Sequence, residues 1–227
     1  MGLPIDLWSF PLDKPDAGSL SADEQARANR FVFARDRDRY VAGRARLRAI
    51  LSQYLDQPAA DIRFGYGSHG RPGVDGIAFN LSHTGDQALL AVAQDVVLGV
   101  DIEAIAPIEM AVAKAHFAPE ELRALLALPE PGQVPAFYRC WTRKEAYLKA
   151  MGTGLATDLS SFTVTLGPNE DPKLLTCAPG DAAAWQLFDV APAPGIAGAL
   201  AVRAGAQQVT LNWRSDVPAA HRFSNRA

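Results

Sequence analysis

Two acidic residues, Asp101 and Glu103, alternate with apolar residues in the segment 98–103. Successive side chains of a β-strand point to opposite faces, so both carboxylates share one face while Val100 and Ile102 share the other. Two carboxylates in one small volume repel each other, and a hard divalent cation removes that penalty. A D-x-E pair alone is usually the solvent-exposed face of a strand, so this pair is informative only together with other residues.

A third acid and a lysine occur in the segment 141–149, which has a helical pattern. Trp141, Glu145 and Lys149 are spaced four apart and therefore share one stripe of the helix. A Glu–Lys pair at this spacing is commonly a surface pair that contributes about a few tenths of a kcal/mol. The pattern places an acid and a cation side by side, without showing what they face.

The composition limits the classes of function. The chain has 227 residues, 48% hydrophobic and 21% charged, which is typical of a globular protein with a substantial core. A net charge of -3 argues against a nucleic-acid partner. The two cysteines, Cys140 and Cys177, form no C-x-x-C pattern, and neither a basic leader nor a run of roughly 20 apolar residues occurs. We therefore expect a cytoplasmic protein that binds no nucleic acid and no membrane.

The elements that must position these side chains form two similar sets. The first set is predicted as a strand over 5–12, two helices from Ser21 to Leu55, and a meander of strands over 77–81, 88–93 and 96–103. The second is predicted as a helix beginning at 117–121, a helix over 134–151, and strands near 162–166, 185–190 and 197–202. This order predicts two α+β halves joined near 104–108, with a ligand in the cleft between them.

Three motifs occur in order along the chain: Phe79-Asn80-Leu81-Ser82-His83, Gly99-Val100-Asp101-Ile102-Glu103 and Trp141-Thr142-Arg143-Lys144-Glu145-Ala146-Tyr147-Leu148-Lys149. Together they resemble the signatures of the Sfp-type 4'-phosphopantetheinyl transferase family, and the likeness extends roughly over 5–202. The resemblance implies an α+β fold of two pseudo-twofold-related halves, each with helices packed on a small antiparallel sheet. Residues 1–104 would hold the adenosine 3'-phosphate side, and 105–227 the metal and pyrophosphate side, shared with Asp101 and Glu103.

The resemblance implies an enzyme of the holo-[acyl-carrier-protein] synthase type. Such an enzyme transfers the 4'-phosphopantetheine moiety of coenzyme A to a serine of an apo acyl or peptidyl carrier protein and releases adenosine 3',5'-bisphosphate. It also implies a Mg²⁺ cofactor, coenzyme A as cosubstrate and a monomeric state.

Roles for the acids and lysines follow from the same resemblance. Asp101, Glu103 and Glu145 would be the Mg²⁺ ligands, a set of hard oxygens that suits this ion. Glu145, or a water that it holds, would be the base that activates the serine. Lys149 would contact the pyrophosphate and assist the leaving group, and Lys144 is similar to another family lysine that faces the same phosphates.

The first half would bind the adenosine 3'-phosphate. Arg39 corresponds to a family arginine that contacts this phosphate, and its planar fork suits that task. Ser82 and His83 match a family pair near the phosphates of the ligand. Arg71, in Gly70-Arg71-Pro72, occupies a position where relatives carry lysine, which retains the charge but changes the geometry.

Some positions depart from the family pattern. Glu24 and Arg27 align with two positions where basic residues of relatives help to bind the 3'-phosphate, so the first of these two is acidic here. The position of Glu103 also varies among relatives.

Two other classes of function stay open from the sequence. One is a different Mg²⁺-dependent enzyme that cleaves a diphosphate, although the chain has no nucleophile elbow and no phosphate-binding P-loop. The other is an inactive module that binds coenzyme A or a carrier protein. All three acids and Lys149 are present, so the sequence does not indicate a decayed site.

Overall fold

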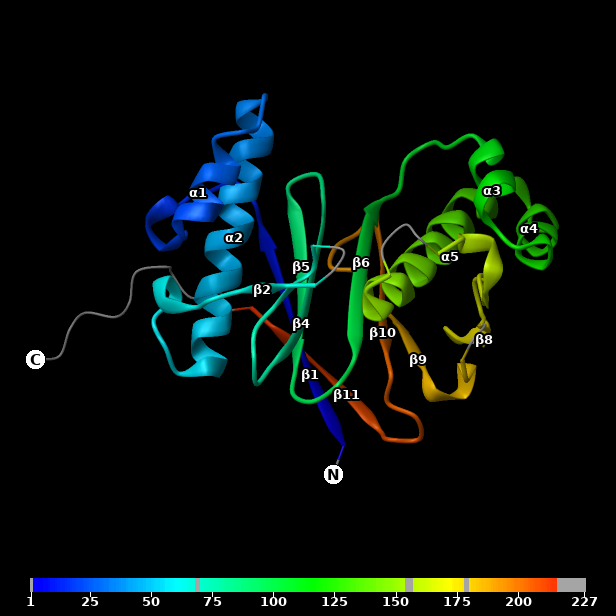
Figure 1. The fold of residues 1–227 in the computed structure, drawn as a ribbon. Coiled ribbons are helices and arrows are strands. Elements are labelled where there is room, and N and C mark those ends of the chain that lie inside the picture. Colours follow the sequence, from blue (N-terminus) through cyan, green and yellow to red (C-terminus); the bar gives the residue numbers. More distant parts are fainter. Residues whose placement is uncertain (1, 68–69, 154–156, 178–179, 216–227) are drawn as a thin grey trace, which may run out of the picture.

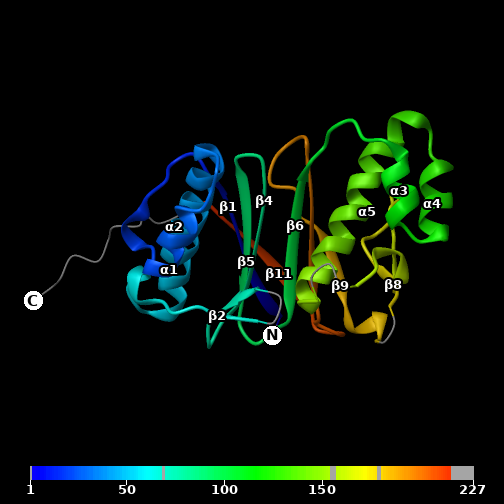
Figure 2. The same cartoon turned by 45° about the horizontal axis from the view of Figure 1, so that its top comes forward.

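The computed structural model describes residues 2–67, 70–153, 157–177 and 180–215. Its helices are α1 (Ala22–Ala28), α2 (Ala34–Leu55), α3 (Met110–His116), α4 (Pro119–Leu126) and α5 (Glu130–Met151). Most strands occupy the middle of the molecule, with α1 and α2 on one side and α3, α4 and α5 on the other (Figures 1 and 2). Helix α3 was not predicted.

Seven of the described strands form two small sheets. The first has the order β11-β1-β5-β4, from β11 (Val209–Arg214), β1 (Leu3–Pro11), β5 (Gln87–Ala93) and β4 (Ala78–Thr84). The second has the order β6-β10-β9, from β6 (Leu98–Ala104), β10 (Ile196–Val202) and β9 (Gln186–Asp189). Short pairs join β2 (Gly65–Tyr66) to β3 (Pro72–Gly73) and β7 (Thr163–Val164) to β8 (Leu174–Thr176).

The predicted α+β fold with small antiparallel sheets is confirmed. The pairing is antiparallel within both sheets, except that β11 joins the edge of β1 in parallel. The predicted meander is wrong at its last strand, because β6 pairs with β10 and not with β5. The division between the two sheets therefore falls before Leu98.

A buried ion cluster joins the helices of the first half. Glu24, the third residue of α1, accepts hydrogen bonds from Arg44 and Arg48 of α2 and closes a capping box with Ser21. Arg48 is 1% exposed and also donates to the carbonyl oxygens of Ala59 and Ile62, at 2.7 and 3.0 Å. Burial opposes ionisation of Glu24, but the hydrogen bond from Arg48 and the charge of Arg44 outweigh it and lower the pKa of Glu24.

The second half repeats this cluster with a lysine. Glu121, the third residue of α4, pairs with Lys144 of α5 at 2.8 Å. Lys144 also donates to the carbonyl oxygens of Leu159 and Phe162. Arg48 and Lys144 occupy the same place when the two 22-residue helices are aligned from their first residues, and each binds the carbonyls of a short 3₁₀ turn. This repetition of chemistry supports two related halves more strongly than sequence identities do.

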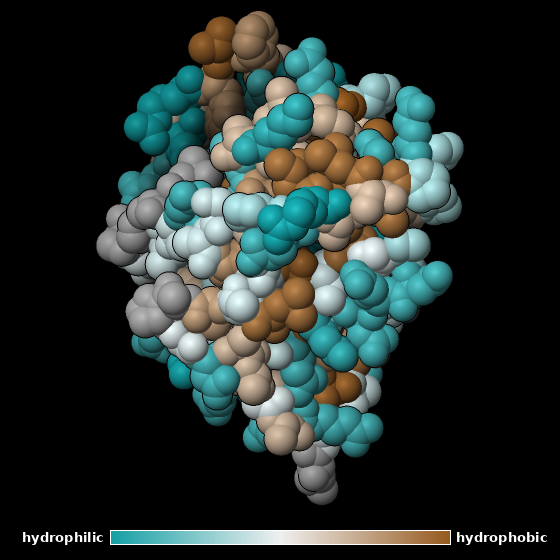
Figure 3. All heavy atoms as spheres, turned by 90° about the vertical axis from the view of Figure 1, so that its right-hand side faces the viewer, coloured by the Kyte–Doolittle hydropathy of each residue, from teal (hydrophilic) through white to brown (hydrophobic). Residues whose placement is uncertain are grey.

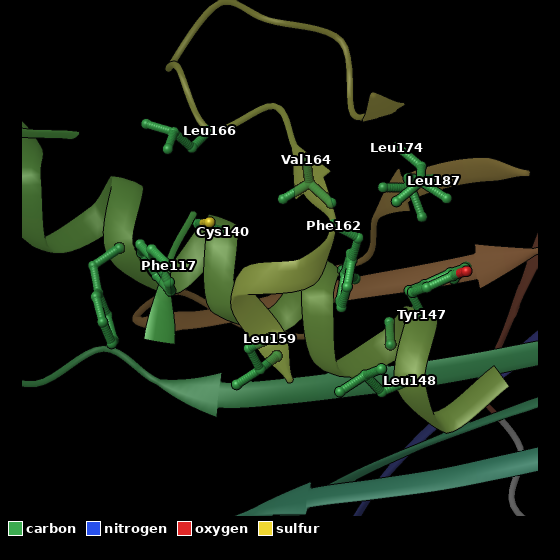
Figure 4. Close-up of a cluster of buried hydrophobic side chains, with 14 of the residues drawn as sticks. Phe117, Cys140, Tyr147, Leu148, Leu159, Phe162, Val164, Leu166, Leu174 and Leu187 are labelled. Carbon is green, nitrogen blue, oxygen red and sulfur yellow. The ribbon is translucent and has the colours of Figure 1, made fainter. Parts of the chain in front are cut away.

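Apolar side chains fill the space around α5. The close-up in Figure 4 shows part of this core, with Phe162 and Tyr147 between α5 and the chain that follows it. Their ring centroids lie 4.9 Å apart. On the outer side, α3 and α4 present apolar side chains among hydrophilic ones (Figure 3), and Leu126 stays 45% exposed. The core thus fixes α5 from one side, while its opposite face is left for β6.

Replacing Glu24 by Gln should lower the free energy of unfolding by about 3–5 kcal/mol at pH 7, because two arginines lose their buried counter-charge. The native pKa of Glu24 lies below its unfolded value, so its stabilisation is present at neutral pH and is lost as the pH falls through the native pKa. Urea unfolding at several pH values should therefore show a difference from wild type that shrinks on acidification. Asp23→Asn, at an exposed neighbour, should cost less than about 1 kcal/mol. A difference that is constant with pH would contradict this role.

Candidate active site

Helix α5 packs directly on β6, and Gly99 makes this contact possible. A Cβ atom at Gly99 would lie 2.3 Å from the carbonyl oxygen of Ala146 and 2.3 Å from the main-chain nitrogen of Ala150. Any side chain there would push the helix away from the strand. The period of two then places Gly99, Asp101 and Glu103 on the face of β6 that looks toward α5.

Asp101 lies at the centre of this interface and is 3% exposed. Its Oδ1 atom accepts hydrogen bonds from Ser82 Oγ at 2.9 Å and from Lys149 Nζ at 2.6 Å. Its Oδ2 atom is buried and has no hydrogen-bond partner among the described residues. Burial raises the pKa of Asp101, and the charge and hydrogen bond of Lys149 only partly offset that effect.

Glu103 and Glu145 complete the acidic part of the site. Both line one pocket of about 330 Å³ together with Asp101 and Lys149. Burial raises the pKa of Glu103 and of Glu145, and the charge of Asp101 raises both further. The three acids predicted from two separate motifs are therefore brought together. As the side chains stand, no three acidic, histidine or cysteine residues of the described chain form a ready-made metal cluster, and Lys149 instead occupies one oxygen of Asp101.

The strand β4 contacts β6 through its side chains and not through its main chain. It lies beside β6 at the boundary of the two sheets, and its side-chain oxygens accept hydrogen bonds from main-chain N–H groups of β6. These bonds run from Val100 to Asn80 at 2.8 Å, from Ile102 to Ser82 at 3.3 Å and from Ala104 to Thr84 at 2.9 Å. Ser82 therefore touches the main chain of β6, Asp101 and Lys149 at once.

Asn80 and Thr84 were not among the predicted site residues. The signal was the alternation of Asn80, Ser82 and Thr84 in one strand, which puts all three on the same face. Trp141 was predicted to share a stripe with Glu145 and Lys149, and it lines the pocket. The sequence pattern alone assigns it no role.

The first half contributes His83 and Arg39 near this pocket. His83 lines the pocket, and partial desolvation lowers its pKa, with the charges of Lys149 and Arg39 acting in the same direction. Arg39 donates from Nε to Asp86 at 2.7 Å. One terminal nitrogen of Arg39 is buried and has no hydrogen-bond partner within the described ranges. This orphan donor is suited to an anion.

Two of the predicted phosphate-binding residues lie elsewhere. Lys144 is fully buried in the ion cluster with Glu121, because neighbouring residues of a helix point about 100° apart and Glu145 takes the face toward the pocket. Arg71 lies outside the pocket that contains Asp101, and its guanidinium binds main-chain carbonyl groups.

The acidic departure at Glu24 has a structural explanation, since that residue is 2% exposed and bound by arginines of α2. Arg27, the second of the two aligned positions, is exposed, with its guanidinium 5.3 Å from the centre of the Tyr40 ring.

Comparison with known proteins places these observations in one family. Residues 97–203 match the model of the 4'-phosphopantetheinyl transferase superfamily, and residues 16–95 match the N-terminal model of 4'-phosphopantetheinyl transferases. The two matches meet where the structure divides the two sheets.

Two relatives and one solved structure are similar to this chain. The 4'-phosphopantetheinyl transferase HetI of Nostoc sp. is 40% identical over 212 residues, which cover 87% of each chain. The 4'-phosphopantetheinyl transferase Sfp of Bacillus subtilis is 32% identical over 150 residues, which cover 65% of this chain and 66% of Sfp. A crystal structure of holo-[acyl-carrier-protein] synthase from Thermotoga maritima aligns with 47% of this chain and 62% of its own, at 22% identity and a TM-score of 0.39.

The chain therefore belongs to the 4'-phosphopantetheinyl transferase superfamily. It is an enzyme that transfers phosphopantetheine from coenzyme A to carrier proteins. Among the described helices, none is long and apolar enough to cross a membrane.

Replacing Gly99 by Ala should separate α5 from β6 and misplace Glu145 and Lys149 relative to Asp101. We expect a loss of about 1–3 kcal/mol in the free energy of unfolding from overpacking. We also expect kcat to fall by about 100-fold, since a displacement of roughly 1 Å has that effect on a positioned group. Gly65→Ala is the matched control, because a Cβ atom at Gly65 meets nothing within 4 Å. Full activity of the Gly99 variant would show that the close contact is dispensable.

Asp101→Asn should separate activity from stability. Its raised pKa means that the ionised carboxylate is less favourable in the folded protein than in water, so a neutral residue of the same shape relieves a cost. We expect a thermal midpoint at or above that of wild type in metal-free buffer, measured by calorimetry. Transfer should fall by more than about 100-fold. A clearly lowered midpoint would mean that Asp101 is needed for folding. Asp95→Asn, at an exposed turn, should change neither quantity.

Proposed function

We propose that this enzyme is a Mg²⁺-dependent transferase of the holo-[acyl-carrier-protein] synthase type, which acts on apo acyl or peptidyl carrier proteins. The observation that carries the proposal is the buried Oδ2 atom of Asp101, which has no hydrogen-bond partner in the part of the chain that the structure describes. Asp101 lines a pocket with two further acids and a lysine. An unpartnered ionised oxygen in a buried site costs free energy unless a ligand binds it.

The donor set fits Mg²⁺. Asp101, Glu103 and Glu145 offer carboxylate oxygens, which this ion prefers together with phosphate oxygens and water. Their pKa values are all raised by burial, as expected where a bound cation would normally offset the charge. When bound, the ion would orient the diphosphate and offset its developing negative charge.

The chain's own side chains supply the proton chemistry. A serine hydroxyl is a weak nucleophile until a base takes its proton, and a carboxylate with a raised pKa is better matched to this task than an ordinary one. We assign this role to Glu145, acting directly or through a water. Lys149 is held by Asp101 and Ser82, so its ammonium group is fixed where it can donate a hydrogen bond to the pyrophosphate and to the leaving group.

The adenosine 3'-phosphate is assigned to the first half. Arg39 has a buried terminal nitrogen that no described residue pairs with, and the charge of Arg39 raises the positive potential at His83. A phosphate that accepts a hydrogen bond from each would satisfy the orphan nitrogen and favour protonation of His83. The pocket is lined by residues of β4, β6 and α5 from a single chain, so we expect the enzyme to act as a monomer. We also expect it to act in the cytoplasm, without a nucleic-acid or membrane partner.

Incubation of the protein with an apo carrier protein, coenzyme A and Mg²⁺ tests the proposal. Intact-mass spectrometry should show a gain of one phosphopantetheine on the carrier, and a metal chelator should abolish this gain. Cleavage of coenzyme A without a mass gain would indicate a different diphosphate-cleaving enzyme. Binding of coenzyme A without cleavage would indicate an inactive module.

The division of coenzyme A between the two halves gives a further expectation. Dephospho-coenzyme A lacks the 3'-phosphate and should bind wild type about 10- to 100-fold more weakly, from the loss of charge-assisted hydrogen bonds of about 1.5–3 kcal/mol. This discrimination should shrink in Arg39→Ala and in His83→Ala. In Lys149→Ala it should persist while kcat falls, since Lys149 acts on charge that develops during transfer.

Isothermal titration of both ligands against the three variants measures this. If Arg39→Ala and His83→Ala discriminate between the ligands as well as wild type does, the 3'-phosphate lies elsewhere.

A further inference from the structure

Arg71 makes a set of contacts that differs from that of a ligand-binding arginine. One terminal nitrogen donates to the carbonyl oxygens of Lys149 and Ala150, at 2.6 and 3.1 Å. The other donates to the carbonyl oxygens of Leu98 and Phe79, at 2.9 and 3.3 Å. Both terminal nitrogens of the half-buried side chain are thus directed at main-chain oxygens.

The four acceptors belong to the three elements that build the active site. Lys149 and Ala150 lie in the last turn of α5, where carbonyl groups have no partner within the helix and attract positive charge. Leu98 begins β6 and immediately precedes Gly99, where α5 touches the strand. Phe79 lies on β4, the strand that bears Ser82.

We propose that Arg71 is a positioning residue, whose guanidinium holds the end of α5 against the start of β6 and against β4. The carbonyl oxygen that it binds most closely belongs to Lys149, whose ammonium group meets Asp101 on the other side of the interface. Arg71 thereby fixes the main chain of the residue that carries the catalytic ammonium. This inference rests on the proposed function and adds a role that the resemblance did not imply, since by the resemblance Arg71 binds the 3'-phosphate.

The chemistry of the side chain supports positioning over phosphate binding. A guanidinium presents its donors in a fixed planar fork, so it can bridge several oxygens held at fixed places. To bind a phosphate with both terminal nitrogens, Arg71 would have to release carbonyl groups at the end of a helix and in two strands. A lysine has one nitrogen and cannot span these acceptors in the same way.

Steady-state kinetics of Arg71→Ala and Arg71→Lys, well below their thermal midpoints, test the proposal. We expect kcat to fall by about 10- to 100-fold in Arg71→Ala, because Lys149 and Glu145 lose their fixed placement. Arg71→Lys should restore only part of this loss. The KM for coenzyme A, and the ratio of affinities for coenzyme A and dephospho-coenzyme A, should stay within about 2-fold of wild type. Arg63→Ala is the matched control, an exposed arginine that lines the same surface cavity as Arg71.

Either of two results for Arg71→Ala would overturn the inference. Loss of discrimination between the two ligands in Arg71→Ala, with recovery in Arg71→Lys, would make Arg71 a phosphate ligand. A lowered thermal midpoint with unchanged kcat would make it a purely structural residue.

Hydrogen–deuterium exchange of the free enzyme separates this inference from the proposed function, because it needs no turnover. Arg71→Ala should increase exchange at least about 10-fold in peptides that cover the last turn of α5 and the start of β6, because local opening there becomes easier. Peptides from α1 and α2 should be unaffected. Unchanged exchange at α5 and β6 would refute the positioning role of Arg71, even if transfer is observed. Increased exchange would support that role, even if wild type fails to modify a carrier protein.

Discussion

The active site depends on the absence of a side chain at Gly99. Because the main chain of α5 lies directly on β6 there, a strand with a period of two and a helix with a period of 3.6 present their polar side chains to the same small volume. Asp101 and Glu103 come from the strand, and Glu145 and Lys149 from the helix. Charged side chains at so close an interface are partly removed from solvent, so each other's charges or a ligand must stabilise them. One steric constraint thereby sets both the geometry and the raised pKa values of the acids.

The boundary between the sheets explains how the pocket can open beside a buried strand. One edge of β6 is paired with β10 by a regular ladder, and the other meets side-chain oxygens of β4. These oxygens satisfy N–H groups that a continuous sheet would have paired with main-chain carbonyls. The strands stay adjacent without forming one sheet, and Ser82 is free to contact both Asp101 and Lys149. The boundary between the sheets therefore places polar side chains of β4 beside β6, where a continuous sheet would have paired main-chain groups only.

Periodicity predicted the parts of the site that lie within one element. The shared face of Asp101 and Glu103 and the stripe of Glu145 and Lys149 follow from local geometry, and the structure brings both to one pocket. The partners of Lys144 and Arg71 depend on distant segments, which no local pattern specifies. The same holds for β11, whose pairing with β1 joins residues about 200 positions apart and completes a sheet that the sequence predicted without its edge strand.

The two halves share a buried ion cluster, but only the second half carries an acid at the position of Asp101. Each buries a glutamate from the start of one helix against a cation of the next, and each ties that cation to a 3₁₀ turn. The segment Leu89-Leu90-Ala91-Val92 of β5 resembles the segment Ala199-Leu200-Ala201-Val202 of β10. This alignment matches Leu89 with Ala199, and these residues pair with Ser9 and Asp101 respectively. The first half therefore carries a serine where the second carries the central acid. A carboxylate that is buried without a full counter-charge lowers stability, so a second such acid at the position of Ser9 would only add a cost.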